Sequence, residues 1–172
     1  SAQDLKELRK NVGSLMYPAL GSRPDVLAPI GIVSQGQSEQ KCTVQHVELS
    51  RKLVRYFAHT KKRVLVCPLE EPEINADTGK VRWTLNGFFD ANFSSEKARS
   101  GILLKLGNCT FSWKSSRQRV VSLSTAEAEL IACSHSCREL IGIRNVLVDL
   151  FDCEVDCHLW GDNAASVAIA SN

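Results

Sequence analysis

Apolar residues in the first third of the chain recur at the spacing of an α-helix. Four of them follow one another at steps of three and four residues and would share one face: Leu5, Leu8, Val12 and Leu15. Gly21 and the polar residues 22–25 interrupt this pattern, and a shorter apolar stretch follows over residues 26–33. A second helical face is then marked by Val44, Val47, Val54 and Phe57. The pattern predicts a small helical unit.

Residues 67–80 show little apolar periodicity. They contain Pro68 and Pro72, several acidic side chains and Gly79, a composition typical of a linker. We therefore expect a helical segment over residues 1–66, a linker over residues 67–80 and a second domain over residues 81–172.

Alternating polar and apolar positions begin after this stretch. Val81, Trp83 and Leu85 alternate with polar residues in a run that ends at Asp90, which predicts a strand. Residues 100–106 and 109–114, separated by Gly107 and Asn108, have the length and turn residues of a β-hairpin. Residues 155–160 predict a fourth strand.

A long helix is expected between the hairpin and the last strand. Ser124 and Glu127 have the spacing of a capping box, in which Ser124 is the N-cap and Glu127 reaches back to it. An apolar stripe follows that would cover the sheet: Leu130, Cys133, Cys137, Leu140, Leu147 and Leu150. A further helix is expected to begin at Asp162 and Asn163.

Composition and charge narrow the function only a little. The chain has 172 residues, 44% of them hydrophobic, and a formal charge of +2, so any site for a polyanion must be local. Seven cysteines without an N-terminal apolar signal segment favour free thiols in a reducing compartment. Cys133 and Cys137 stand four apart within a helical pattern, which favours buried residues over a zinc site. No apolar run is long enough to cross a membrane, so we expect a soluble protein.

Three carboxylates stand at the ends of predicted elements. Asp90 closes the first strand, Glu129 lies in the first turns of the long helix and Asp162 follows the last strand. An aspartate in such a position is most often a turn or N-cap residue. If the two strands are neighbours under the helix, however, all three side chains converge, and converging carboxylates suit Mg²⁺ or Mn²⁺. Two such ions can activate a water and stabilise the leaving oxygen of a phosphodiester.

A basic cluster precedes the long helix. Lys114, Arg117 and Arg119, with the hydroxyl of Ser115, could contact a phosphate backbone. The alternative is a solvated loop between strand and helix, and the sequence leaves both possibilities open.

Several motifs resemble copia-type retrotransposon (Pseudoviridae) Pol polyproteins. Residues 12–17 (VGSLMY), 22–25 (SRPD) and 55–56 (RY) resemble the end of the reverse transcriptase. The second half is similar to the ribonuclease H motifs of that family, in order: residues 90–93 (DANF), 99–101 (RSG), 112–115 (SWKS), 122–129 (SLSTAEAE) and 162–163 (DN). The resemblance spans nearly the whole chain.

This resemblance implies an α/β fold, a ribonuclease H-like mixed sheet flanked by helices. It implies metal-dependent hydrolysis of the RNA strand of RNA–DNA hybrids during reverse transcription, with two Mg²⁺ ions held by Asp90, Glu129 and Asp162. It selects Glu129 over Glu127 as the catalytic glutamate and adds Asn163 to the nucleic-acid contacts. The implied partners are the hybrid and the rest of the reverse transcriptase polyprotein, without a membrane. The implied location is cytoplasmic, in the virus-like particle of the element.

Two departures from the family pattern bear on this expectation. The family usually has Asp-Ala-Asp-Trp at its first motif, where this chain has Asn92 and Phe93 in the last two positions. The family also continues past Asn172 into a segment with a histidine and a further active-site aspartate, so the domain over residues 81–172 is expected to be incomplete at its C-terminus. The alternative to a nuclease is a catalytically inactive remnant, or a module that holds a hybrid or a reverse transcriptase partner without cutting it.

Overall fold

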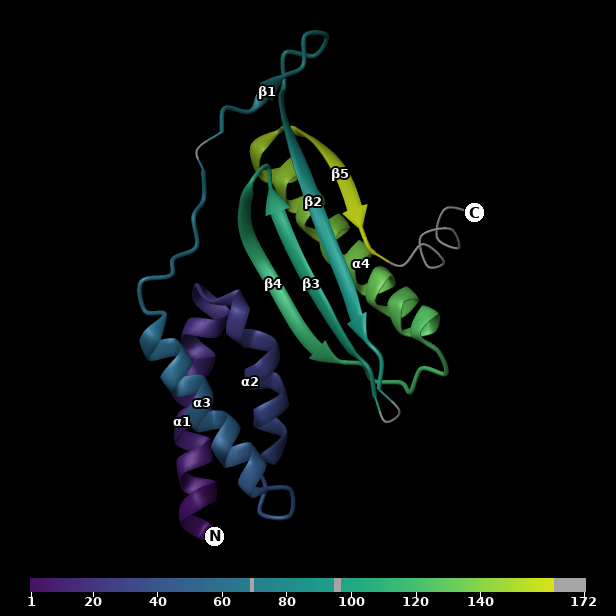
Figure 1. Ribbon diagram of the computed structural model, residues 1–172. Coiled ribbons are helices and arrows are strands. Elements are labelled where there is room, and N and C mark those ends of the chain that lie inside the picture. The colour runs from purple at the N-terminus through teal and green to yellow at the C-terminus, as the bar shows by residue number, and fades with distance from the viewer. Residues whose placement is uncertain (69, 95–96, 163–172) are drawn as a thin grey trace. The chain divides into compact units, whose positions relative to one another are not determined.

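The computed structural model describes residues 1–68, 70–94 and 97–162 (Figure 1). The chain divides into two compact units, the first from Ser1 to Leu65 and the second from Val66 onward. None of the helices in these described ranges is long and apolar enough to cross a lipid bilayer.

The first unit is helical. Its helices are α1 (Ala2–Gly21), α2 (Leu27–Val33) and α3 (Val44–His59), with short 3₁₀ turns at Pro24–Val26 and Ser34–Gly36. The predicted face of α1 is confirmed, because all four of its apolar residues are buried: Leu5, Leu8, Val12 and Leu15. The predicted face of α3 is wrong in part, since Val44 and Val54 are exposed and the residues buried on that helix are Val47 and Ser50.

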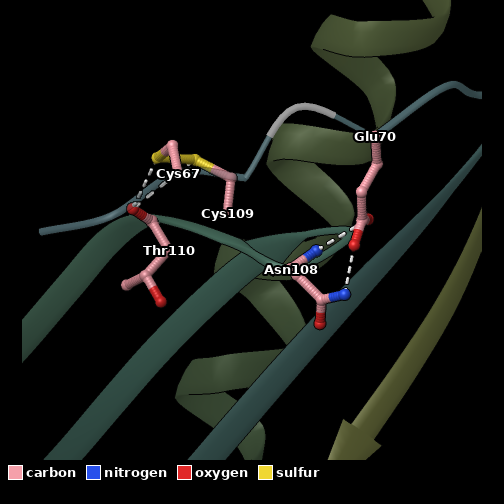
Figure 2. The surroundings of a disulfide bond; sticks show 5 residues. All are labelled: Cys67, Glu70, Asn108, Cys109 and Thr110. Carbon is pink, nitrogen blue, oxygen red and sulfur yellow. Dashed lines mark hydrogen bonds between the residues drawn. A yellow bond between two sulfur atoms is a disulfide. The ribbon is translucent and has the colours of Figure 1, made fainter.

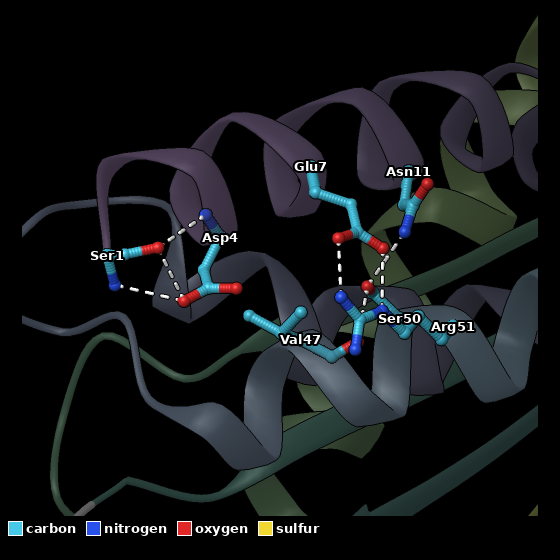
Figure 3. Close-up of polar contacts among 7 residues, drawn as sticks. All are labelled: Ser1, Asp4, Glu7, Asn11, Val47, Ser50 and Arg51. Carbon is cyan, nitrogen blue, oxygen red and sulfur yellow. Dashed lines mark hydrogen bonds and ion pairs between the residues drawn. The ribbon is translucent and has the colours of Figure 1, made fainter.

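Polar contacts explain the α3 result, because the helix meets α1 partly through side-chain hydrogen bonds (Figure 3). The amide of Asn11 donates to the buried hydroxyl of Ser50 at 3.0 Å, and that hydroxyl donates to the carbonyl of Val47 at 2.7 Å. Arg51 forms a two-pronged ion pair with Glu7, at 2.7 and 2.6 Å. A satisfied polar pair can occupy a buried position that periodicity alone assigns to an apolar residue.

Arg23 connects the turn after α1 to the end of α3 through hydrogen bonds. Its guanidinium is buried, donates two hydrogen bonds to Asp25 at 2.8 and 2.7 Å, and reaches the carbonyl and hydroxyl of Thr60 at 3.1 and 2.8 Å. It also stacks on the ring of Phe57, 4.6 Å from the ring centroid. These hydrogen bonds hold the pKa of Asp25 below its usual range. The charge of Arg23 is thus fully paired inside the unit.

The second unit is a mixed sheet with a long helix on one face (Figure 1). Its strands are β1 (Glu73–Ile74), β2 (Val81–Asn92), β3 (Arg99–Leu106), β4 (Cys109–Arg117) and β5 (Glu154–Trp160), and its helix is α4 (Thr125–Phe151). β2, β3 and β4 are antiparallel neighbours, whereas β5 pairs with the other edge of β2 in parallel. The predicted fold class is confirmed, since this arrangement is consistent with a ribonuclease H-like α/β fold.

The buried face of the sheet packs against α4. One core cluster gathers Leu85, Leu104 and Val155 around Leu140 of the helix. The helix approaches the sheet closely at Gly87, where an added Cβ would lie 2.7 Å from the Leu140 side chain.

The predicted stripe of α4 is only partly correct. Cys133 and Leu140 are buried, but Leu150 is 71% exposed. The residues that α4 buries are mostly small, apart from a glutamate and a leucine: Ala128, Glu129, Ala132, Cys133, Ser136 and Leu140. Small residues let the first half of α4 lie against the sheet, and burying a glutamate there calls for a specific explanation.

The start of α4 is capped nearly as expected. The hydroxyl of Ser124 accepts a hydrogen bond from the backbone N–H of Glu127 at 3.1 Å. The Glu127 carboxylate, however, accepts from the N–H of Leu123 at 2.6 Å, one residue before the N-cap. Glu127 is therefore engaged in capping, as the spacing predicts.

Several residues of the stretch 67–80 contact the rest of the second unit. Cys67 forms a disulfide with Cys109 at the start of β4 (Figure 2). Glu70 accepts hydrogen bonds from the backbone and side-chain amides of Asn108 in the β3–β4 turn. The expectation that every cysteine is a free thiol is thus wrong for one pair. The remaining five are free, and among them Cys133 and Cys153 are buried.

The end of the same stretch is held from the other side by Glu154. Asn75 and Thr78 donate to its carboxylate at 2.6 and 2.7 Å, and Arg82 donates at 2.9 Å. These donors lower the pKa of Glu154 to about 2. Glu154 thereby joins the turn before β2 to the first residue of β5.

Candidate metal centre

Two aspartates lie at matching positions on neighbouring strands. β2 and β5 run parallel, and Phe88 is paired with Trp160, so Asp90 and Asp162 each lie two residues beyond the same rung. Parallel strands end at the same edge of a sheet, and both carboxylates therefore reach that edge. Glu129 comes from the second turn of α4, which crosses the sheet there.

The structure brings the three predicted carboxylates together. One oxygen of each, from Asp90, Glu129 and Asp162, lies within 4.8 Å of the others. This separation is close to the oxygen–oxygen spacing around one divalent cation, since carboxylate oxygens bind such ions at about 2.0–2.6 Å. The role of these residues as metal ligands stays a prediction.

The buried glutamate is the most unusual member of the group. Glu129 is only 5% exposed, and its Oε1 accepts a hydrogen bond from the backbone N–H of Ala91 at 3.1 Å. Its Oε2 is buried and has no hydrogen-bond partner among the described residues. Burial raises the pKa of Glu129, and the neighbouring charges of Asp90 and Asp162 raise it further. A cation would relieve both effects, so the residues present fit a divalent metal ion.

A glycine sets the position of Asp162. Gly161 lies against the ring of Phe89 so closely that a Cβ at this position would overlap the ring. The glycine allows the chain to leave β5 in contact with β2, which brings the next residue to the carboxylate group. The reading of the sequence missed this residue, although a glycine directly before a candidate ligand is a usable signal.

A buried glutamine sets the position of the helix. Gln118 is 2% exposed, and its side-chain amide donates to the Ser100 hydroxyl at 2.9 Å and to the Ala128 carbonyl at 2.8 Å. It thereby fastens the first turn of α4 to β3, one residue before Glu129. Sequence reasoning missed Gln118 because the side chain stands between two arginines in a segment that reads as a basic loop.

Comparison with known proteins relates the chain to one curated protein closely enough to show its family. No protein-family profile matches the chain, and no solved structure matches it significantly. It is 33% identical over 134 residues to the secreted RxLR effector protein 161 of Plasmopara viticola, an alignment that covers 76% of this chain and 86% of that protein. The chain belongs to the same family as this effector protein.

The chain is also similar to retrovirus-related Pol polyproteins of plant transposons. Identity is 27% over 165 residues with that of transposon TNT 1-94 from Nicotiana tabacum, and 28% over 151 residues with that of transposon RE1 from Arabidopsis thaliana. The alignments cover 94% and 86% of this chain but only 11% and 9% of the polyproteins. The resemblance to transposon Pol polyproteins is confirmed at this level, and the chain spans about a tenth of their length.

The residues predicted from the sequence to contact nucleic acid do not all lie on one surface of the second unit. Lys114 points toward α4, where it forms an ion pair with Glu139 at 2.9 Å. Ser115 is paired with Gly101 on β3 and accepts from Arg99 at 3.4 Å, so it belongs to the other face of the sheet. Arg119 follows β4. Asn163 lies outside the described residues.

A groove runs between the edge strand β4 and helix α4. Its volume is about 540 Å³, and it contains three of the predicted contact residues together with side chains from the helix. The polar residues that line it are Lys114, Ser116, Arg117, Arg119, His135, Arg138 and Glu139.

Proposed function

We propose that the second unit is a retrotransposon ribonuclease H that cuts the RNA strand of RNA–DNA hybrids by metal-dependent hydrolysis. The observation that supports this most directly is the group formed by Asp90, Glu129 and Asp162, with ligating oxygens within 4.8 Å of one another. The ribonuclease H-like fold and the similarity to transposon Pol polyproteins are consistent with it.

Each carboxylate has a distinct part in the proposed site. Asp90 and Asp162 are exposed at the edge of the sheet, where a phosphodiester can approach. Glu129 is buried and held by the Ala91 N–H, so it fixes the inner side of the site. Mg²⁺ ions, or Mn²⁺ in their place, would supply an activated water and stabilise the leaving oxygen when bound. Side chains that hold such ions must remain ionised, which a bound cation favours.

The first unit and the cellular setting are further parts of the proposal. We place the first unit at the C-terminal end of a reverse transcriptase, because residues 12–17 and 22–25 resemble that region. The proposed partners are the RNA–DNA hybrid and the rest of the polyprotein, and the proposed location is the cytoplasmic particle in which reverse transcription occurs.

The substitution Asp162→Asn tests the proposal. It keeps the size of the side chain and removes the charge that holds a hard cation, so we expect cleavage of a labelled hybrid in Mg²⁺ to be lost. Hybrid binding should remain, because it depends mainly on phosphate contacts. Asp156→Asn is the matched control, since Asp156 is an exposed aspartate of β5 that lies outside the carboxylate group.

Parallel reactions with double-stranded DNA and single-stranded RNA define the substrate. Preferential cutting of the hybrid supports ribonuclease H, whereas cutting of duplex DNA indicates a DNA nuclease of the same fold. Full hybrid cleavage by the Asp162→Asn protein would place the active site elsewhere.

The second candidate is a protein that holds a hybrid or a reverse transcriptase partner without cutting it. A relative that is named as an effector rather than as an enzyme is consistent with this alternative. Tight hybrid binding without cleavage in either Mg²⁺ or Mn²⁺ would support it over the nuclease.

A further inference from the structure

The groove between β4 and α4 is strongly basic. Among the residues that the structure describes, four cationic side chains line it, and one carboxylate, Glu139, opposes them. Glu139 is engaged by Lys114 in the ion pair described above. In the described part of the chain, neither Arg119 nor Arg138 forms an ion pair. The groove therefore carries an excess of positive charge, which attracts anions.

Its walls come from two rigid elements. Ile131, His135 and Arg138 stand at positions i, i+4 and i+7 of α4 and share one face of the helix. Lys114 and Ser116 come from alternate positions of β4 and point to the same side of the sheet. The donors on these walls are hydroxyl, imidazole, ammonium and guanidinium groups, which together suit a phosphate.

The groove lies a short way along α4 from the carboxylate group. His135 and Arg138 follow Glu129 by six and nine residues, which places them about 9 and about 14 Å further along the helix axis. For a duplex whose axis runs along α4, one base-pair step advances by roughly 3.4 Å, so this offset corresponds to roughly three to four steps. A duplex with one phosphodiester at the carboxylates would thus present further phosphates near the groove.

We propose that this groove binds a backbone phosphate of the same nucleic-acid duplex, roughly three to four base pairs from the bond at the carboxylates. The inference rests on the proposed function for the identity of the duplex. It adds His135 and Arg138 of α4 to the contacts expected from the sequence and removes Ser115 from them. The groove contributes affinity and register, while the carboxylates contribute the chemistry.

Two substitutions of opposite sign test the groove. Arg138→Gln should weaken binding of an RNA–DNA hybrid on the order of tenfold and reduce the slope of log affinity against log salt by about 1. Glu139→Gln removes the opposing charge and should tighten binding severalfold. Arg144→Gln is the matched control, because Arg144 is an exposed arginine on the same helix that does not line the groove. It should change neither quantity.

The measurement is fluorescence anisotropy of a labelled hybrid with the full chain at several salt concentrations in EDTA. Without a divalent ion, binding is read independently of cleavage. Equal behaviour of the Arg138→Gln and Arg144→Gln proteins, or weaker binding by Glu139→Gln, would overturn the proposal. Binding of a polyglutamate peptide to the groove without any change in the affinity for the hybrid would also overturn the proposal. That result would assign the groove to an acidic protein segment.

Failure of the proposed function has a different signature. Titration calorimetry with Mn²⁺ reports on the carboxylate group alone. Absence of Mn²⁺ binding and of cleavage, with the predicted effects of Arg138→Gln on hybrid binding intact, would refute the nuclease and retain the groove. Normal cleavage and Mn²⁺ binding without any effect of Arg138→Gln would refute the groove alone.

Discussion

Replacing the buried glutamate tests whether the carboxylate group is built for a cation. In the absence of divalent ions, we expect Glu129→Gln to raise the free energy of unfolding of the second unit. The substitution keeps an oxygen that can accept from the Ala91 N–H and removes a charge that is buried beside Asp90 and Asp162. A functional site is a place where such a local cost is tolerated.

The expected size follows from the geometry. Two unit charges 4.8 Å apart repel each other by about 0.9 kcal/mol in a water-like medium and about 3.5 kcal/mol at an effective dielectric constant of 20. Asp90 and Asp162 are exposed, so the lower part of this range applies to each. The hydrogen bond from Ala91 loses about 1 kcal/mol when its acceptor becomes neutral. We expect a net stabilisation of about 1–2 kcal/mol at pH 7.

Tryptophan fluorescence during urea unfolding measures this effect selectively. The three tryptophans, Trp83, Trp113 and Trp160, all belong to the second unit. Because the pKa of Glu129 is raised, the wild-type free energy of unfolding should fall as pH rises from the ordinary glutamate value of 4.5 toward the raised one. It should stay lower above that window, and the Glu129→Gln protein should lack the fall.

Divalent ions supply the complementary test. Mg²⁺ or Mn²⁺ should stabilise the wild-type protein in proportion to its affinity for the folded state and should stabilise the Glu129→Gln protein much less. The reasoning is refuted if Glu129→Gln lowers the free energy of unfolding in EDTA by 1 kcal/mol or more, because the carboxylate would then be a structural group.

Two further predictions concern the segment before β2. Reduction of the disulfide between Cys67 and Cys109, which are separated by 42 residues, should lower the free energy of unfolding of the second unit by about 4 kcal/mol and make residues 67–80 the first site of limited proteolysis. The Cys42→Ser protein is the control, because Cys42 is a free thiol and its replacement leaves the disulfide intact. First cleavage elsewhere in the reduced protein would contradict the expectation. The pKa of Glu154 lies at about 2, so its stabilising contribution is present above pH 4.5 and is lost as pH falls toward 2. Glu154→Gln should flatten that acid-dependent loss in fluorescence-monitored unfolding, and an unchanged profile would assign the loss to other groups.

Local patterns predicted most of the second unit. The alternation from Val81 to Asp90 and the turn at Gly107 and Asn108 depend on residues close in sequence, and the strands and hairpin lie where these patterns place them. The convergence of Asp90, Glu129 and Asp162 required one additional assumption, that the first and last strands are neighbours, which the parallel pairing of β2 and β5 fulfils.

Features that depend on distant partners were not predictable in the same way. Periodicity extended the buried stripe of α4 to Leu150, but the side chain there is exposed. The pairing of Cys67 with Cys109 joins positions 42 residues apart, and cysteine spacing alone cannot select it. Gln118 acquires its role only when β3 and α4 meet, because its two hydrogen-bond acceptors come from those elements.

The close approach of α4 to the sheet at Gly87 connects this position to the carboxylate group through the helix. Leu140 rests on this glycine, and Glu129 lies eleven residues, or about 16 Å, nearer the start of the helix. A side chain at position 87 would push against the Leu140 side chain, and any movement of the helix in response would tilt the glutamate relative to the two aspartates, which are carried by the strands. The spacing of the three carboxylates is therefore adjustable from a position that touches none of them. Variation at Gly87 offers a route by which metal affinity changes while every ligand is retained.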